Sequence, residues 1–119
     1  LYGDKRAALF FTREALRTAP QHGLVLEEAI GHMLMNMLLP ESAVDERMRH
    51  SQAGVRLYQQ LGDHTGTSYM HAAIASLHFQ RNNFQQALAY NDSTLAAAHR
   101  AIAGGHEHHE TIAGNYQFR

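Results

Sequence analysis

The clearest indication of the fold is the stretch G66-T-S-Y-M-H-A-A-I-A-S-L-H-F79, continued by R81-N-N-F-Q-Q-A-L-A-Y90. Its first part carries apolar residues three or four positions apart, which places them on one face of a helix. They are Met70, Ala73, Ile74 and Leu77. The polar pair Asn82-Asn83 then indicates a turn before a second apolar stripe begins. Two helices joined by so short a turn pack antiparallel as a hairpin.

The same helical periodicity runs through the rest of the chain, and no stretch alternates with the period of two that strands require. Three further stripes predict buried helix faces: Leu26, Ala29, Ile30, Met33 and Met37; Phe84, Ala87, Leu88, Asn91, Leu95, Ala98 and Ile102; and, more weakly, Val44, Met48, Val55 and Tyr58. Pro20 and Pro40 mark helix ends, because proline cannot supply an interior helical hydrogen bond. We therefore expect an all-α chain of six helical segments, at about 4–19, 23–39, 43–61, 64–81, 84–103 and 107 to the end.

The chain also repeats itself. A shift of 79 residues aligns Gly3-Asp4 with Asn82-Asn83, Ala8-Leu9 with Ala87-Leu88, Leu16 with Leu95, and Ala19 with Ala98. A second pattern places Gly or Ala after an isoleucine in A29-I-G-H-M33, A73-I-A-S-L77 and T111-I-A-G-N115. Such a small residue lets two helices approach closely. The shift corresponds to two units of about 40 residues, each a helical hairpin.

These residues resemble the tetratricopeptide repeat (TPR) family. The resemblance rests on Ala75 in the middle of the first helix, on the turn Asn82-Asn83-Phe84, and on the pair Ala87-Leu88. It covers most of the chain, and the long repeat is similar to those of bacterial signalling proteins and transcription regulators. The resemblance implies an α-α superhelix in a single domain, residues 1–119, that is a fragment of a longer chain. It also implies a non-catalytic module for protein–protein interaction, the sensory or scaffold part of a bacterial regulatory protein.

Composition narrows the function further. With a formal net charge of -1, the chain has no overall basic field to hold nucleic acid or an anionic membrane. The chain has no cysteine, which removes thiolate metal ligands and thiol nucleophiles. The most apolar stretch, residues 24–39, is interrupted by Glu27, Glu28, His32 and Asn36, so it cannot span a bilayer unaided. For a regulatory module of this kind we expect a cytoplasmic location. No phosphate-binding loop or nucleophile elbow is present, so we expect no enzymatic activity and no cofactor.

Histidines and glutamates are concentrated in A101-I-A-G-G-H-E-H-H-E110. We interpret this segment as a solvated turn between repeats, in which Gly104 or Gly105 takes the left-handed backbone that ends a helix. The alternative is a zinc site built from His106, His109 and Glu110, which would share a helix face. The order of these residues does not supply the His-Glu-x-x-His signature of zinc proteases.

The resemblance also implies where a partner binds, because the first helix of each hairpin lines the concave groove in that family. The matching positions are Glu28, His32, Met35, Asn36, Tyr69, Ala72, Ser76, Phe79 and Gln80. We expect Met33 and Met37 to pack in the core and Met35 to face the groove. Residues 23–39 and 64–80 contain no Lys or Arg, which favours a neutral peptide or helix over an anionic terminus. The histidine in the groove predicts that partner binding depends on pH. Self-association of the chain is the remaining alternative to binding a partner protein.

Overall fold

The computed structural model describes residues 2–108 of the chain, and within them it is all-helical, without a strand. This confirms the all-α prediction. The elements are α1 (Tyr2–Thr18), a 3-10 helix η1 (Ala19–His22), α2 (Val25–Leu38), α3 (Val44–Leu61), α4 (His64–Gln80) and α5 (Phe84–His108). Each of the first five predicted segments corresponds to one α-helix, with differences of a few residues at the ends.

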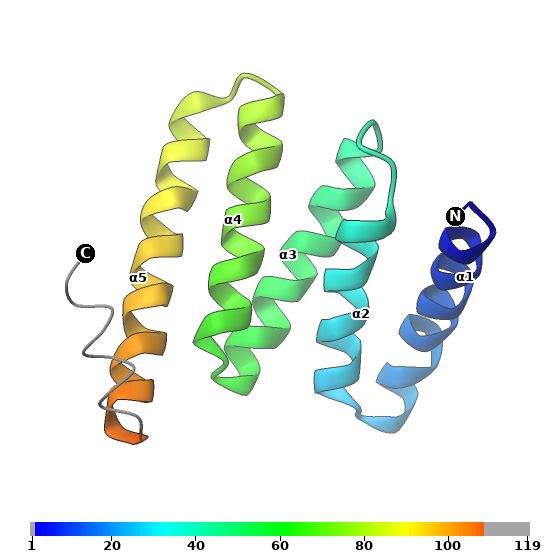
Figure 1. Cartoon of the computed structure of the whole chain (residues 1–119), viewed down its shortest axis with the longest axis horizontal. Helices are drawn as coiled ribbons and strands as arrows, with labels where there is room; N and C mark the ends of the chain where they lie inside the picture. Colours follow the sequence, from blue (N-terminus) through cyan, green and yellow to red (C-terminus); the bar gives the residue numbers. More distant parts are fainter. Residues whose placement is uncertain (1, 109–119) are drawn as a thin grey trace.

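The helices stand side by side in chain order, from α1 at one end to α5 at the other (Figure 1). Packing is almost confined to chain neighbours: α1 on α2, α2 on α3, α3 on α4, and α4 on α5. Among residues 2–108, each inner helix is therefore covered by its two chain neighbours, and the end helices α1 and α5 by one. The remaining faces stay open to solvent, which is where the surfaces available to a partner lie.

Local sequence signals set most of the helix ends. Helix α1 ends just before Pro20, and Leu39, the residue before Pro40, is extended with ψ 150°. Gly62 closes α3 with φ 70°, a left-handed backbone that glycine adopts without strain. Asp63 then caps α4 by accepting a hydrogen bond from the Gly66 backbone N–H at 2.9 Å. The helix ends predicted at Pro20 and Pro40, and the break predicted between residues 61 and 64, are confirmed.

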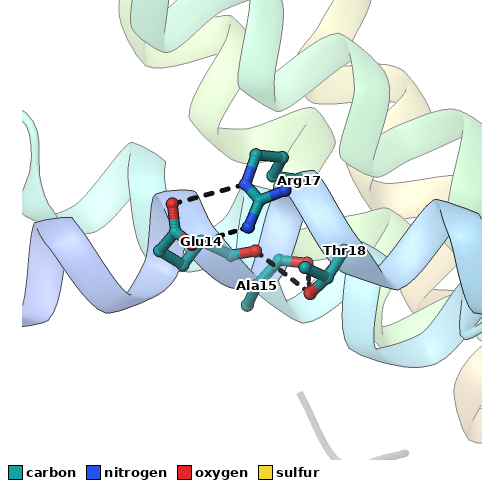
Figure 2. Close-up of polar contacts among 4 residues, drawn as sticks. All are labelled: Glu14, Ala15, Arg17 and Thr18. Atoms are coloured by element: carbon teal, nitrogen blue, oxygen red, sulfur yellow. Dashed lines mark hydrogen bonds and ion pairs between the residues drawn. The ribbon is translucent and has the colours of Figure 1, made fainter.

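The last turn of α1 carries its own polar contacts (Figure 2). Arg17 Nη2 lies 2.9 Å from Glu14 Oε2, and Arg17 Nε donates to Glu14 Oε1 at 3.4 Å. The guanidinium, through this hydrogen bond and its charge, lowers the pKa of Glu14. The Thr18 hydroxyl donates to the Glu14 carbonyl at 3.1 Å. A cation in the last helical turn also suits the helix dipole.

The turn predicted at Gly104-Gly105 is wrong. Helix α5 continues through both glycines to His108. A glycine inside a helix costs only about 1 kcal/mol relative to alanine, and no proline follows to stop the helix. The sixth segment, predicted from residue 107 onward, lies outside the described residues beyond His108.

The core lies mainly between α3 and α4. One cluster joins Met48 of α3 to Ile74 and Leu77 of α4, and a second joins Ala29 of α2 to Tyr58 and Met70. Gly54 and Gly66 make this packing possible, because a Cβ on either would press against Met70 or Tyr58 of the core. A Cβ on Gly54 would lie 3.0 Å from the Met70 side chain. The stripes predicted on α3 and α4 are therefore confirmed as core faces.

The stripes predicted on α2 and α5 are only partly buried. On α2, Ala29 is fully buried, but Leu26, Ile30 and Met37 are 47%, 37% and 57% exposed. On α5, Ala87 is buried, whereas Phe84, Leu88, Asn91 and Leu95 are exposed. These residues stay exposed because each apolar stripe is wider than the part of the helix surface that the chain neighbours cover.

Candidate functional site

The outer face of α4 is the part of the predicted groove that lies open. Its members are all exposed and share one side of the helix: Tyr69, Ala72, Ser76, Phe79 and Gln80. Tyr69 is 44% exposed and Phe79 is 63% exposed, which is high for aromatic side chains. Helix α4 contains no Lys, Arg, Asp or Glu. We call this neutral surface the α4 face.

Neighbouring segments hold the C-terminal end of the α4 face in place. Phe79 meets Phe84 of α5 edge to face, with ring centroids 5.3 Å apart. Gln80 Nε2 donates to the Glu41 carbonyl at 3.2 Å and so ties α4 to the loop between α2 and α3. An ion pair between Arg81 and Asp45 lies next to this contact.

The part of the groove predicted on α2 does not form. Met35 is fully buried and Asn36 is 6% exposed, so neither side chain faces an open surface. Helix α3 packs over them: the Ser51 hydroxyl donates to Asn36 Oδ1 at 3.1 Å. The expectation for the methionines is also reversed, because Met37 is exposed while Met35 is in the core.

Glu28 and His32, the other two groove candidates on α2, are half-buried in a polar cluster against α3. His32 Nδ1 lies 2.8 Å from His50 Nδ1, a hydrogen bond in which one imidazole donates to the other. The Nε2 atoms of His32 and His50 face Glu28 at 3.9 Å and Glu46 at 3.6 Å. Arg13 of α1 reaches Glu46 at 3.2 Å, so three helices meet here.

Burial sets the protonation of this histidine pair. Loss of hydration, with contributions from His50 and Arg56, lowers the pKa of His32 to about 4. Burial also lowers the pKa of His50, although the Glu46 carboxylate opposes that change. The pair is therefore neutral at pH 7. Protonation of both rings would point two N–H groups at each other across 2.8 Å, so the contact cannot survive it.

A second histidine arrangement joins α4 to α5. The rings of His71 and His78 lie 5.8 Å and 5.5 Å from the ring of Tyr90, and the Nδ1 atom of each is buried without a hydrogen-bond partner. Ala75 lies between the two histidines on the same side of α4, so it faces α5. Gly31 instead faces the preceding helix, since a Cβ there would lie 2.7 Å from Leu16 Cδ2. Both small residues permit close packing, but against different neighbours.

A shallow apolar groove between α1 and α2 was not predicted from the sequence. Its volume is about 330 Å³. The residues that line it are Phe11, Thr12, Ala15, Glu27, Ile30, Gly31 and Leu34. The sequence feature that could have indicated this groove is the small residue Gly31, which lets α1 and α2 approach closely.

The metal alternative gains no support within the described residues. In that part of the chain, no group of three or more His, Asp or Glu side chains is placed to hold a metal ion. His106 falls on the last turn of α5, and its partners His109 and Glu110 lie outside the described residues.

No protein-family model, curated protein or solved structure matches this chain. Within residues 2–108, no helix is both long enough and apolar enough to cross a membrane.

Proposed function

We propose that this chain is a non-catalytic, TPR-like interaction module that binds a peptide or helix of a partner protein on the α4 face. The observation that carries the proposal is the combination of two exposed aromatic rings, Tyr69 and Phe79, with Ser76 and Gln80 on one uncharged helix side. Aromatic side chains of this kind dominate binding energies at protein interfaces. The amide and hydroxyl groups add hydrogen bonds to a peptide backbone.

The absence of charge on the α4 face defines the partner. An anionic peptide would need Lys or Arg opposite its carboxylates, and α4 has neither. The partner segment is therefore neutral and presents apolar or aromatic side chains. By its resemblance to TPR modules of bacterial regulators, we assign the chain to the sensory or scaffold part of such a protein, acting in the cytoplasm.

A phage-displayed library of random peptides, selected on the purified protein, tests this proposal. Selected peptides should lose binding to the Phe79→Ala variant and keep binding to Phe10→Ala. Phe10 is a matched control because it lies on α1 and is 60% exposed, close to the 63% of Phe79. Circular dichroism confirms that both variants remain helical. Peptides that bind Phe79→Ala and Tyr69→Ala as well as the unsubstituted protein would rule out the α4 face.

A further inference from the structure

The exposed stripe of α5, formed by Phe84, Leu88, Asn91 and Leu95, corresponds in sequence to the side of α1 that packs against α2. The 79-residue shift between the two helices assigns a residue of α1 to each exposed stripe position of α5. Phe84 corresponds to Lys5, Leu88 to Leu9, Asn91 to Thr12, and Leu95 to Leu16.

All four of these α1 residues face α2. Lys5 and Leu9 line a cavity of about 250 Å³ together with Leu38 and Pro40 at the end of α2. Thr12 lines the α1–α2 groove opposite Gly31 and Leu34. Leu16 lies directly against Gly31, where a Cβ would come within 2.7 Å of Leu16 Cδ2.

Within residues 2–108, no helix covers the corresponding residues of α5 in this way. Phe84, Leu88 and Leu95 are 51%, 64% and 59% exposed. They are spaced i, i+4 and i+11, so they form one continuous stripe along the helix. The neighbouring side of α5, with Ala87, Tyr90 and Ala97, is already occupied by α4. In Figure 1, α5 is the outermost helix of the row, with α4 on its inner side.

We propose that the outer stripe of α5 binds a partner helix of the same chemistry as α2. This helix is amphipathic, lies antiparallel to α5, and carries Gly or Ala where Leu95 meets it. A small residue is required because Leu16, the α1 counterpart of Leu95, lies so close to Gly31 that even a Cβ there would displace the end of its side chain, and a larger side chain would push the two helices apart. The proposal goes beyond the α4 face. Phe84 touches Phe79 where the two surfaces meet, but the stripe continues along α5 through Leu88 and Leu95, and its partner is a different one.

A synthetic peptide of residues 24–39, the α2 segment itself, is the probe. Its binding to isotope-labelled protein is followed by backbone amide NMR shifts. We expect shifts at Phe84, Leu88, Asn91 and Leu95, and at least tenfold weaker binding to the Leu95→Arg variant. Leu26→Arg is the control, because Leu26 is an exposed leucine on α2 rather than α5.

A second peptide carrying Gly31→Leu tests the requirement for a small residue. It keeps the apolar character of the probe, and we expect it to bind at least tenfold more weakly. Equal binding of the two peptides, or binding unaffected by Leu95→Arg, would overturn the proposal. Shifts confined to Tyr69 and Phe79 would also overturn it while favouring the α4 face. Dimerisation of the protein that Leu95→Arg abolishes would assign the stripe to a second copy instead.

Discussion

Replacing Gly66 by alanine should destabilise the protein, although alanine is the better helix former. An ideal Cβ on Gly66 would lie 2.3 Å from Tyr58 Cδ1 and 2.6 Å from Cε1. Contacts this short do not occur, so the ring or the helix must move. Tyr58 is 4% exposed and packs with Ala29 and Met70, which leaves its ring little freedom. Overpacking of this kind costs about 1–3 kcal/mol.

The gain from replacing glycine by alanine offsets at most about 1 kcal/mol of this cost. We therefore expect a net loss of about 1–2 kcal/mol. For a chain of this size, the melting temperature should fall by about 4–8 °C. The measurement is thermal and urea denaturation followed by circular dichroism.

Gly31→Ala is the matched control. Its Cβ would lie 2.7 Å from Leu16 Cδ2, the flexible end of a half-buried side chain that can rotate away. The helix-propensity gain of up to about 1 kcal/mol then balances the repacking, and stability should change little. If Gly66→Ala is as stable as the unsubstituted protein, or if Gly31→Ala loses as much, the packing reasoning is refuted.

Three further changes test other parts of the structure. Asp63→Ala removes the side chain that caps the Gly66 N–H and should lower the free energy of unfolding, measured by urea denaturation, by about 1 kcal/mol. An unchanged denaturation midpoint would contradict the role of the cap. Ser51→Ala leaves the buried Asn36 Oδ1 without its hydroxyl donor and should lower the free energy of unfolding by about 1–3 kcal/mol in the same urea experiment. A decrease below about 0.5 kcal/mol would show that water replaces the donor. Because the pKa of His32 is lower in the folded protein than in the unfolded chain, His32 is protonated in the unfolded chain at a higher pH than in the folded protein. The free energy of unfolding should therefore be highest above about pH 6.5 and should decrease as the pH falls to about 4. The shift from 6.5 to about 4 corresponds to about 3 kcal/mol at most, and denaturation at pH 7 and pH 4.5 should show a smaller difference for His32→Gln than for the unsubstituted protein.

Signals close together in the chain predicted the helices and most of their ends. Proline geometry stops α1 and α2, and the pair Gly62-Asp63 both closes α3 and caps α4. These effects depend on backbone conformation and on hydrogen bonds across a few residues, so they can be read from the sequence. Gly104-Gly105 is the exception, because glycine weakens a helix without stopping it.

The groove was predicted on both α4 and α2, but only its α4 part lies open in the structure. The cause is what packs against each helix. Periodicity identifies a helix face, but it does not say whether a neighbour covers that face. On α4, the positions from Tyr69 to Gln80 stay exposed. On α2, helix α3 covers Met35 and Asn36.

The all-helical class, the hairpin boundaries up to α5 and the correspondence between α1 and α5 follow from the amino-acid sequence alone. Which apolar stripes are covered and which histidines meet depends on how the helices pack. His32 and His50 are 18 residues apart, and the repeat pattern contains no signal that pairs them. The physical reason is that helix periodicity follows from local backbone geometry, whereas burial depends on the angle at which a distant helix crosses.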